Sequence, residues 1–172
     1  ADKMRPVRIY FWAFDNEHIL YQQDTGGDEN WHVYSVEVAS GKAIDLTPFE
    51  KVAARVESLS HLRPKAVLIG LNDRNPQFHD VYTVDIASGK RELLLQNEGF
   101  AGFSFDDNLV PRLALQMSAD GGLVIKKAGS KKGAWDDFLT VGQDDSLTTQ
   151  PIDFDRSGRN LYLWDSRGRN TA

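Results

Sequence analysis

Apolar and polar residues alternate over residues 33–38, VYSVEV, so successive side chains fall on opposite faces of an extended strand. The stretch VYSVEVASGK at 33–42 returns at 81–90 as VYTVDIASGK, and the three exchanged positions keep their chemistry. Gly41 and Gly89 occupy the same place after the strand, where a tight turn needs a positive φ. The pattern therefore predicts one strand-and-turn unit, present twice.

The residues around this stretch extend the repeat without a gap. ILYQQD at 19–24 aligns with VLIGLN at 67–72, and a polar stretch follows each of them. A last strand then follows each Ser-Gly-Lys turn, at 42–48 and 90–96. A repeat of 40 to 50 residues built from short strands indicates propeller blades.

The second half of the chain carries weaker copies. Strands are predicted at 112–118, 122–129 and 136–142, and 152–172 resembles 12–31 when Asp155 is set on Asp15. Only 49–59 has a weak helical periodicity, so we expect an all-β protein.

The expected fold is a partial β-propeller of about three to four antiparallel four-stranded blades. We expect its units at approximately 8–58, 59–104, 105–145 and 146–172. The last unit would be truncated after two strands, and the truncation would leave an unpaired sheet edge. We therefore expect the chain to be a fragment of a longer propeller protein.

Composition narrows the function classes. The 172 residues are 41% hydrophobic and 26% charged, as in an ordinary globular protein, and the net charge of −5 argues against nucleic acid as a partner. Four lysines in KKAGSKK, Lys126 to Lys132, are interpreted as a solvated hairpin tip. No apolar run is long enough for a membrane helix.

The chain has no cysteine, which excludes disulfides, thiolate catalysis and cysteine-ligated metal. Cysteine usage does not choose a compartment; our expectation is the cytoplasm, with the periplasm as the alternative.

The residues from ILYQQDTGGDENWHVYSVEVASGK to VLIGLNDRNPQFHDVYTVDIASGK, and the closing DFDRSGRNLYLWDSRGRNTA, carry a family resemblance. They resemble the N-terminal β-propeller of the prolyl oligopeptidase family of serine peptidases, and within it the acylaminoacyl-peptidase and dipeptidyl-peptidase-like members. The resemblance implies a propeller that caps an α/β-hydrolase domain, and that domain carries a Ser-Asp-His triad.

The catalytic domain itself is absent from this sequence. A nucleophile elbow reads G-x-S-x-G, and no such pentapeptide occurs. In the nearest stretch, GFSFD at 102–106, Asp106 replaces the last glycine, so Ser104 is not interpreted as a nucleophile. No histidine shares a motif with it. We therefore expect the chain alone not to be an enzyme, and its parent to be a serine peptidase.

Several stretches are candidate sites. Asp24 to Asn30 resembles a calcium loop but lacks EF-hand spacing, which favours a structural turn. His32 is expected to bond to a neighbouring blade. The loop from Asn72 to Asp80 is the best candidate for contact with substrate or the hydrolase domain. The four tryptophans are expected to pack between blades: Trp12, Trp31, Trp135 and Trp164.

No catalytic, cofactor-binding or metal-ligating residue is assigned, and no cofactor is expected. The leading hypothesis is a non-catalytic propeller segment that gates the access of short peptides to the hydrolase domain of the parent chain. The alternative is a free-standing TolB-like propeller module that binds a protein partner. Expected partners are the hydrolase domain, peptide substrates in the intact enzyme and further copies through open blade edges, but neither nucleic acid nor membrane.

Overall fold

The computed structural model describes residues 5–131 and 133–169, and its elements are β-strands apart from one short 3₁₀ helix, η1 (Gln143–Asp145). The chain divides after Asn97 into two compact units, which are described separately. Over the described residues no helix is long and apolar enough to cross a membrane. The all-β prediction is confirmed.

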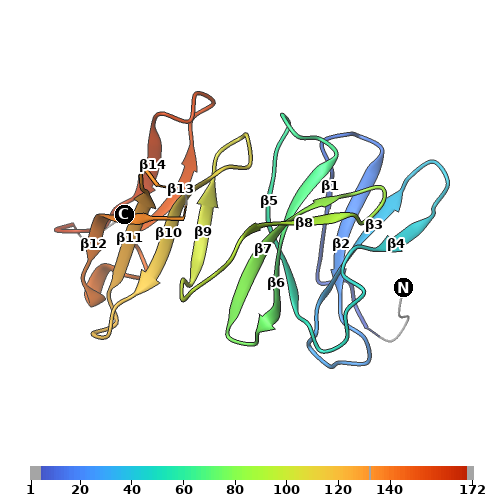
Figure 1. The fold of residues 1–172 in the computed structure, drawn as a ribbon, viewed down its shortest axis with the longest axis horizontal. Helices are drawn as coiled ribbons and strands as arrows, with labels where there is room; N and C mark the ends of the chain where they lie inside the picture. Colours follow the sequence, from blue (N-terminus) through green and yellow to red (C-terminus); the bar gives the residue numbers. More distant parts are fainter. Residues whose placement is uncertain (1–4, 132, 170–172) are drawn as a thin grey trace. The chain divides into compact units, whose positions relative to one another are not determined.

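The first unit contains two four-stranded antiparallel sheets (Figure 1). The strands of the first sheet lie in chain order: β1 (Ile9–Trp12), β2 (His18–Gln23), β3 (His32–Glu37) and β4 (Ala43–Asp45). The strands of the second sheet also lie in chain order: β5 (Ala54–Leu59), β6 (Ala66–Asn75), β7 (Phe78–Asp85) and β8 (Arg91–Leu95). Both sheets have the strand order expected of a propeller blade.

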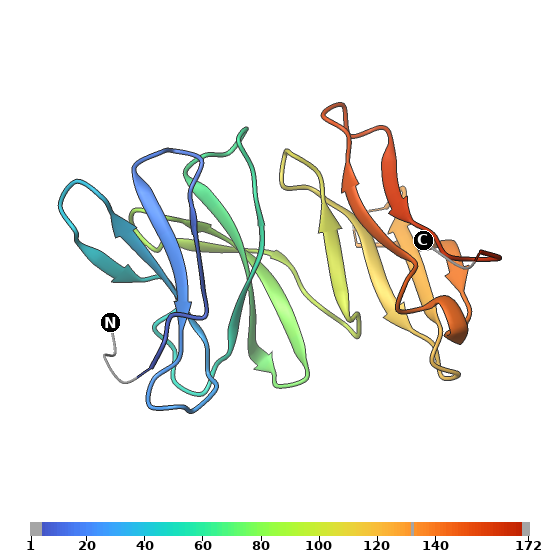
Figure 2. The ribbon, with the colours of Figure 1, turned by 180° about the vertical axis from the view of Figure 1, so that it is seen from behind.

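The second unit repeats the pattern once and then begins it again. Its first sheet contains β9 (Gly102–Phe105), β10 (Pro111–Met117), β11 (Leu123–Ala128) and β12 (Trp135–Val141). β13 (Gln150–Phe154) and β14 (Leu161–Trp164) form a two-stranded hairpin beside this sheet (Figure 2). The architecture is a partial β-propeller of three four-stranded sheets and a two-stranded one, as the sequence predicted.

The sheets divide the chain earlier than the expected unit limits. The limits at 58/59 and 104/105 fall inside β5 and β9, because each of these strands pairs with the strand that follows it. The weak helical periodicity of 49–59 concealed β5, which is an extended strand with a bulge between Val56 and Ser58.

The repeated Ser-Gly-Lys turns have one geometry. Gly41 has φ +68° and Gly89 has φ +73°, as predicted. The amide of each glycine donates to the carbonyl four residues earlier, of Glu37 at 2.8 Å and of Asp85 at 2.9 Å. The two turns therefore share backbone contacts as well as sequence.

A second repeated feature is a polar side chain that caps the turn between the first two strands of each sheet. In the first sheet Asp15 accepts from the amides of Glu17 and His18, and in the fourth Asp155 accepts from those of Arg159 and Asn160. Asp106 and Ser60 accept amide hydrogens at the corresponding turns. One polar side chain at this point therefore caps each turn.

The core of the first unit lies between its two sheets. Leu20 and Val33 from the first sheet pack in one cluster with buried residues of the second, such as Ile69, Val84 and Ile86. These side chains are fully buried, so their apolar area is removed from water on folding. In the second unit Ile125 and Val141 form a smaller cluster, against which Phe154 packs.

Candidate functional site

The stretch from Asn72 to Asp80 is a β-hairpin extension of β6 and β7. Arg74 donates two hydrogen bonds to the buried Asp80 carboxylate, at 2.8 and 3.0 Å, and a third to the Asn97 carbonyl at 2.7 Å. Asp73 accepts from Tyr82 and Arg91. The Arg74 guanidinium of this candidate contact loop is thus bound to the body of its own unit, while Pro76 and Gln77 at the hairpin tip are exposed.

In the acidic loop from Asp24 to Asn30, the carboxylates of Asp24 and Asp28 accept hydrogen bonds. Arg5 donates to both oxygens of Asp24, at 3.0 and 2.9 Å, and this interaction is the largest cause that lowers the pKa of Asp24. Asp28 accepts from the Asn30 amide at 3.1 Å. These contacts are those of a structural turn.

His32 bonds within its own sheet, so the expected bond to a neighbouring blade is wrong. Its Nδ1 lies 2.7 Å from Asp45 Oδ2, and Asp45 lies on β4 directly beside β3. The two side chains meet because neighbouring antiparallel strands bring their residues side by side.

The tryptophans do not form one set of packing residues. Trp135 contacts Phe100 and Phe103, but Trp12 and Trp164 are 57% and 55% exposed. The prediction that all four pack between blades is therefore wrong for these two. Trp12 lies on β1 with its ring away from the buried face of the sheet that carries Leu20, since its cross-strand partner is Ile19.

Ser104 lies within β9, paired with Leu113 on β10, and not at a strand-to-helix turn. Of the lysine-rich stretch, Lys126 pairs with Asp137 and Gly129 begins the loop that leads to β12. Lys132 lies outside the described residues.

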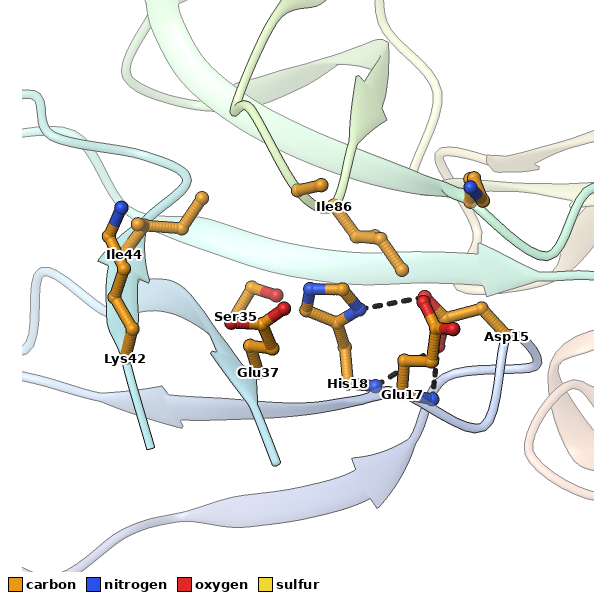
Figure 3. A pocket seen from close by; sticks show the side chains of 10 residues that line it. Asp15, Glu17, His18, Ser35, Glu37, Lys42, Ile44 and Ile86 are labelled. Carbon is orange, nitrogen blue, oxygen red and sulfur yellow. Dashed lines mark hydrogen bonds and ion pairs between the residues drawn. The ribbon is translucent and has the colours of Figure 1, made fainter. Parts of the chain in front are cut away.

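A cavity of about 310 Å³ lies between the sheets of the first unit (Figure 3). Its polar lining is contributed by the turn after β1, by β2 and β3, and by two lysines: Asp15, Glu17, His18, Ser35, Glu37, Lys42 and Lys65. Ile44, Ile86 and Ala87 form its apolar part. It combines an imidazole, a hydroxyl, carboxylates and ammonium groups at the edge of the core.

Asp15 and His18 form the best-ordered pair in this cavity. His18 Nδ1 lies 2.7 Å from Asp15 Oδ2, and the two side chains are 12% and 5% exposed. Burial alone would raise the pKa of Asp15, but the Glu17 amide and the His18 ring and amide donate to the carboxylate and lower it. Asp15 is therefore ionised near neutral pH and accepts the Nδ1 hydrogen of His18.

Ser35 is the unsatisfied group of the cavity. Its residue is 1% exposed, and its Oγ is the buried side-chain atom in the described part of the chain that has no hydrogen-bond partner. In Figure 3 the His18 ring lies between Asp15 on one side and Ser35 and Glu37 on the other. The sequence analysis missed this cavity, although Asp-x-Glu-His at 15–18 was a signal for it.

Comparisons with known proteins identify the segment. Dipeptidyl aminopeptidase BIII of Pseudoxanthomonas mexicana is 43% identical over 172 residues, and dipeptidyl peptidase family member 6 of Caenorhabditis elegans is 34% identical over 170. These alignments cover 99% and 91% of this chain, but 25% and 23% of the relatives. The chain matches one segment of each dipeptidyl peptidase and spans about a quarter of their length, which agrees with the predicted resemblance to a propeller segment of the prolyl oligopeptidase family.

Solved structures agree on the fold of this segment. TolB from Acinetobacter baumannii has a TM-score of 0.59 at 13% identity, and the match covers 95% of this chain and 38% of the TolB chain. A prolyl endopeptidase structure has a TM-score of 0.53 at 15% identity, and the match covers 92% of this chain and 26% of the prolyl endopeptidase chain. No protein-family model matches the chain.

Proposed function

We propose that this segment gates the access of peptides to a serine-peptidase domain elsewhere in the intact protein. The observation that carries the proposal is the 43% identity with a dipeptidyl aminopeptidase over essentially the whole chain. The segment itself lacks a G-x-S-x-G elbow, so the chemistry is assigned to another part of the protein.

The fold suits a gate better than a reaction centre. Each described unit has a buried apolar core, while turns and hairpin tips such as Pro76–Gln77 reach solvent at the strand ends. Rigid sheets with exposed loops can exclude large substrates by size, and short peptides pass. The likeness to TolB shows the fold alone and adds no support for a free-standing binding module.

The test uses the full-length protein that carries this segment. One N-terminal sequence is presented in three substrates: a dipeptidyl chromogenic amide, an unfolded peptide of about thirty residues, and the same N-terminus fused directly to a folded domain. We expect kcat/KM to fall by a factor of about 100 only for the folded substrate, a loss of about 3 kcal/mol of transition-state stabilisation.

The outcomes separate the two parts of the proposal. Equal cleavage of the folded and unfolded substrates would overturn the gate, and no release of dipeptides from any substrate would overturn the peptidase assignment. A variant in which the hairpin tip at 76–77 is replaced by Asn-Gly keeps the strands paired and asks whether this tip contributes to the gate.

We also propose a cytoplasmic location. Cell fractionation with detection of this segment tests it, and recovery from the periplasm would contradict it.

A further inference from the structure

We propose that Asp15, Glu17 and His18 bind a divalent cation of the zinc class in the cavity of the first unit. Each residue offers one ligand atom, and these atoms lie within 4.8 Å of one another. Imidazole nitrogen and carboxylate oxygen both ligate zinc, and three protein ligands with water in the fourth position form an open zinc site. The sequence analysis assigned no metal ligand, so this site comes from the structure.

Two of the three ligand groups, the Asp15 carboxylate and the His18 ring, are already held in place at the turn. Asp15 is held by the Glu17 and His18 amides at 2.9 and 3.0 Å, and its other oxygen lies 2.7 Å from His18 Nδ1. A cation that replaces the Nδ1 hydrogen would meet Asp15 and Glu17 on the same side of the ring (Figure 3). Side-chain ordering on binding would then fall mainly on the exposed Glu17.

The turn needs the Asp15 carboxylate as its cap, but it does not need the side chains of Glu17 and His18. The corresponding turns are capped by Ser60, Asp106 and Asp155, and none of these turns has the Asp-x-Glu-His sequence of 15–18. A capping aspartate alone satisfies the backbone. Glu17 and His18 are thus additional to the structural requirement.

Ser35 provides the second, independent observation. Its buried hydroxyl has no hydrogen-bond partner and lies on the side of the His18 ring opposite Asp15 (Figure 3). When a cation occupies Nδ1, the ring hydrogen moves to Nε2, which faces Ser35 and Glu37. Ligating histidines commonly direct their second N–H to such an outer group.

The remaining charges of the cavity do not oppose a cation strongly. Lys42 extends away from the His18 ring in Figure 3, and Lys65 is near enough to Asp85 to help lower the pKa of that carboxyl. Glu37 also lines the cavity and keeps its formal charge balance negative.

Calorimetric titration of the purified protein with Zn²⁺, and Co²⁺ absorption spectroscopy, test the site. We expect one equivalent to bind, Glu17→Gln and His18→Asn to weaken binding at least about tenfold, and Ser35→Ala to weaken it less. His32→Asn is the matched control, because His32 has the same 2.7 Å contact with an aspartate but belongs to no such three-residue cluster within the described residues. It should bind as the wild type does.

No binding up to millimolar Zn²⁺ would overturn the proposal, as would binding that His18→Asn leaves unchanged or that His32→Asn weakens equally. Should a variant fail to fold, nitrogen NMR of the wild-type histidines decides. We expect Zn²⁺ to shift the His18 hydrogen from Nδ1 to Nε2 and to leave His32 unchanged, and an unchanged His18 would contradict the site.

Discussion

The Arg74 guanidinium donates two hydrogen bonds to the Asp80 carboxylate, with Nε 2.8 Å from Oδ2 and Nη2 3.0 Å from Oδ1. The carboxylate is buried, with its side chain 3% exposed, and it also accepts from the Asn97 amide at 2.7 Å. The pair joins the β6–β7 hairpin to the chain that follows β8.

Arg74→Ala should lower the free energy of unfolding by about 2 kcal/mol, because a buried carboxylate loses its charged donor. Urea unfolding measures the change. Lys90→Ala is the control, since Lys90 and Glu92 form a pair whose side chains are 77% and 75% exposed, and its effect should stay within about 0.5 kcal/mol. Equal effects of the two substitutions would contradict the structural role of Arg74.

Gly41→Ala should destabilise the first unit through the backbone alone. Gly41 has φ +68°, and a Cβ there would meet nothing within 4 Å, so the cost of about 1 kcal/mol is conformational. Gly142 has equally open space but φ −67°, so Gly142→Ala should be nearly neutral. Thermal unfolding of both variants checks this, and a neutral Gly41→Ala would show that the turn is formed differently.

Asp155 should make stability depend on pH in the acid range. Hydrogen bonds from the Asn160 amide, then from Ser157, lower the pKa of Asp155 from 3.8 to about 2. Because the folded pKa is depressed, its stabilising contribution is present above about pH 4 and is lost as the pH falls towards 2.

The melting temperature of Asp155→Asn should therefore lie below that of the wild type near neutral pH, and the difference should shrink as the pH approaches 2. A difference that stays constant over this range would show that the charge of Asp155 does not stabilise the turn.

The outer face of the first sheet should mediate self-association of the chain. Tyr10 and Trp12, on one face of β1, are 74% and 57% exposed, and Val38, directly after β3 in the same sheet, is 47% exposed. The double substitution Tyr10→Lys and Trp12→Lys should reduce the mass measured by light scattering at high concentration. Leu147→Lys, which changes an isolated residue that is 89% exposed, should not. A wild-type chain that stays monomeric would contradict this prediction.

Much of the fold could be predicted from the sequence because each sheet repeats a local pattern. Alternating apolar positions set the strands, and Gly41 and Gly89 set the turns, so strand order followed from chain order. β5 was harder to recognise, since apolar residues at 49–59 fit a helical spacing, and only pairing with β6 extends the strand.

The cavity could be predicted less well, because its parts come together only in space. Asp15 and His18 are neighbours in sequence, yet Ser35 joins them from β3 and Ile86 from beyond β7. Likewise, no sequence pattern around Arg74 indicated that its guanidinium would bind Asp80. That bond occupies the guanidinium, which then does not serve as a recognition group on the surface.

The central proposal is that the segment belongs to a serine peptidase whose chemistry lies elsewhere in the protein. The most direct measurement is labelling of the active full-length protein with a fluorophosphonate, followed by peptide mapping of the modified serine. The account predicts that the labelled serine lies outside residues 1–172 and that labelling abolishes the release of dipeptides. A labelled serine within the segment, Ser104 included, or dipeptide release that continues after complete labelling, would contradict it.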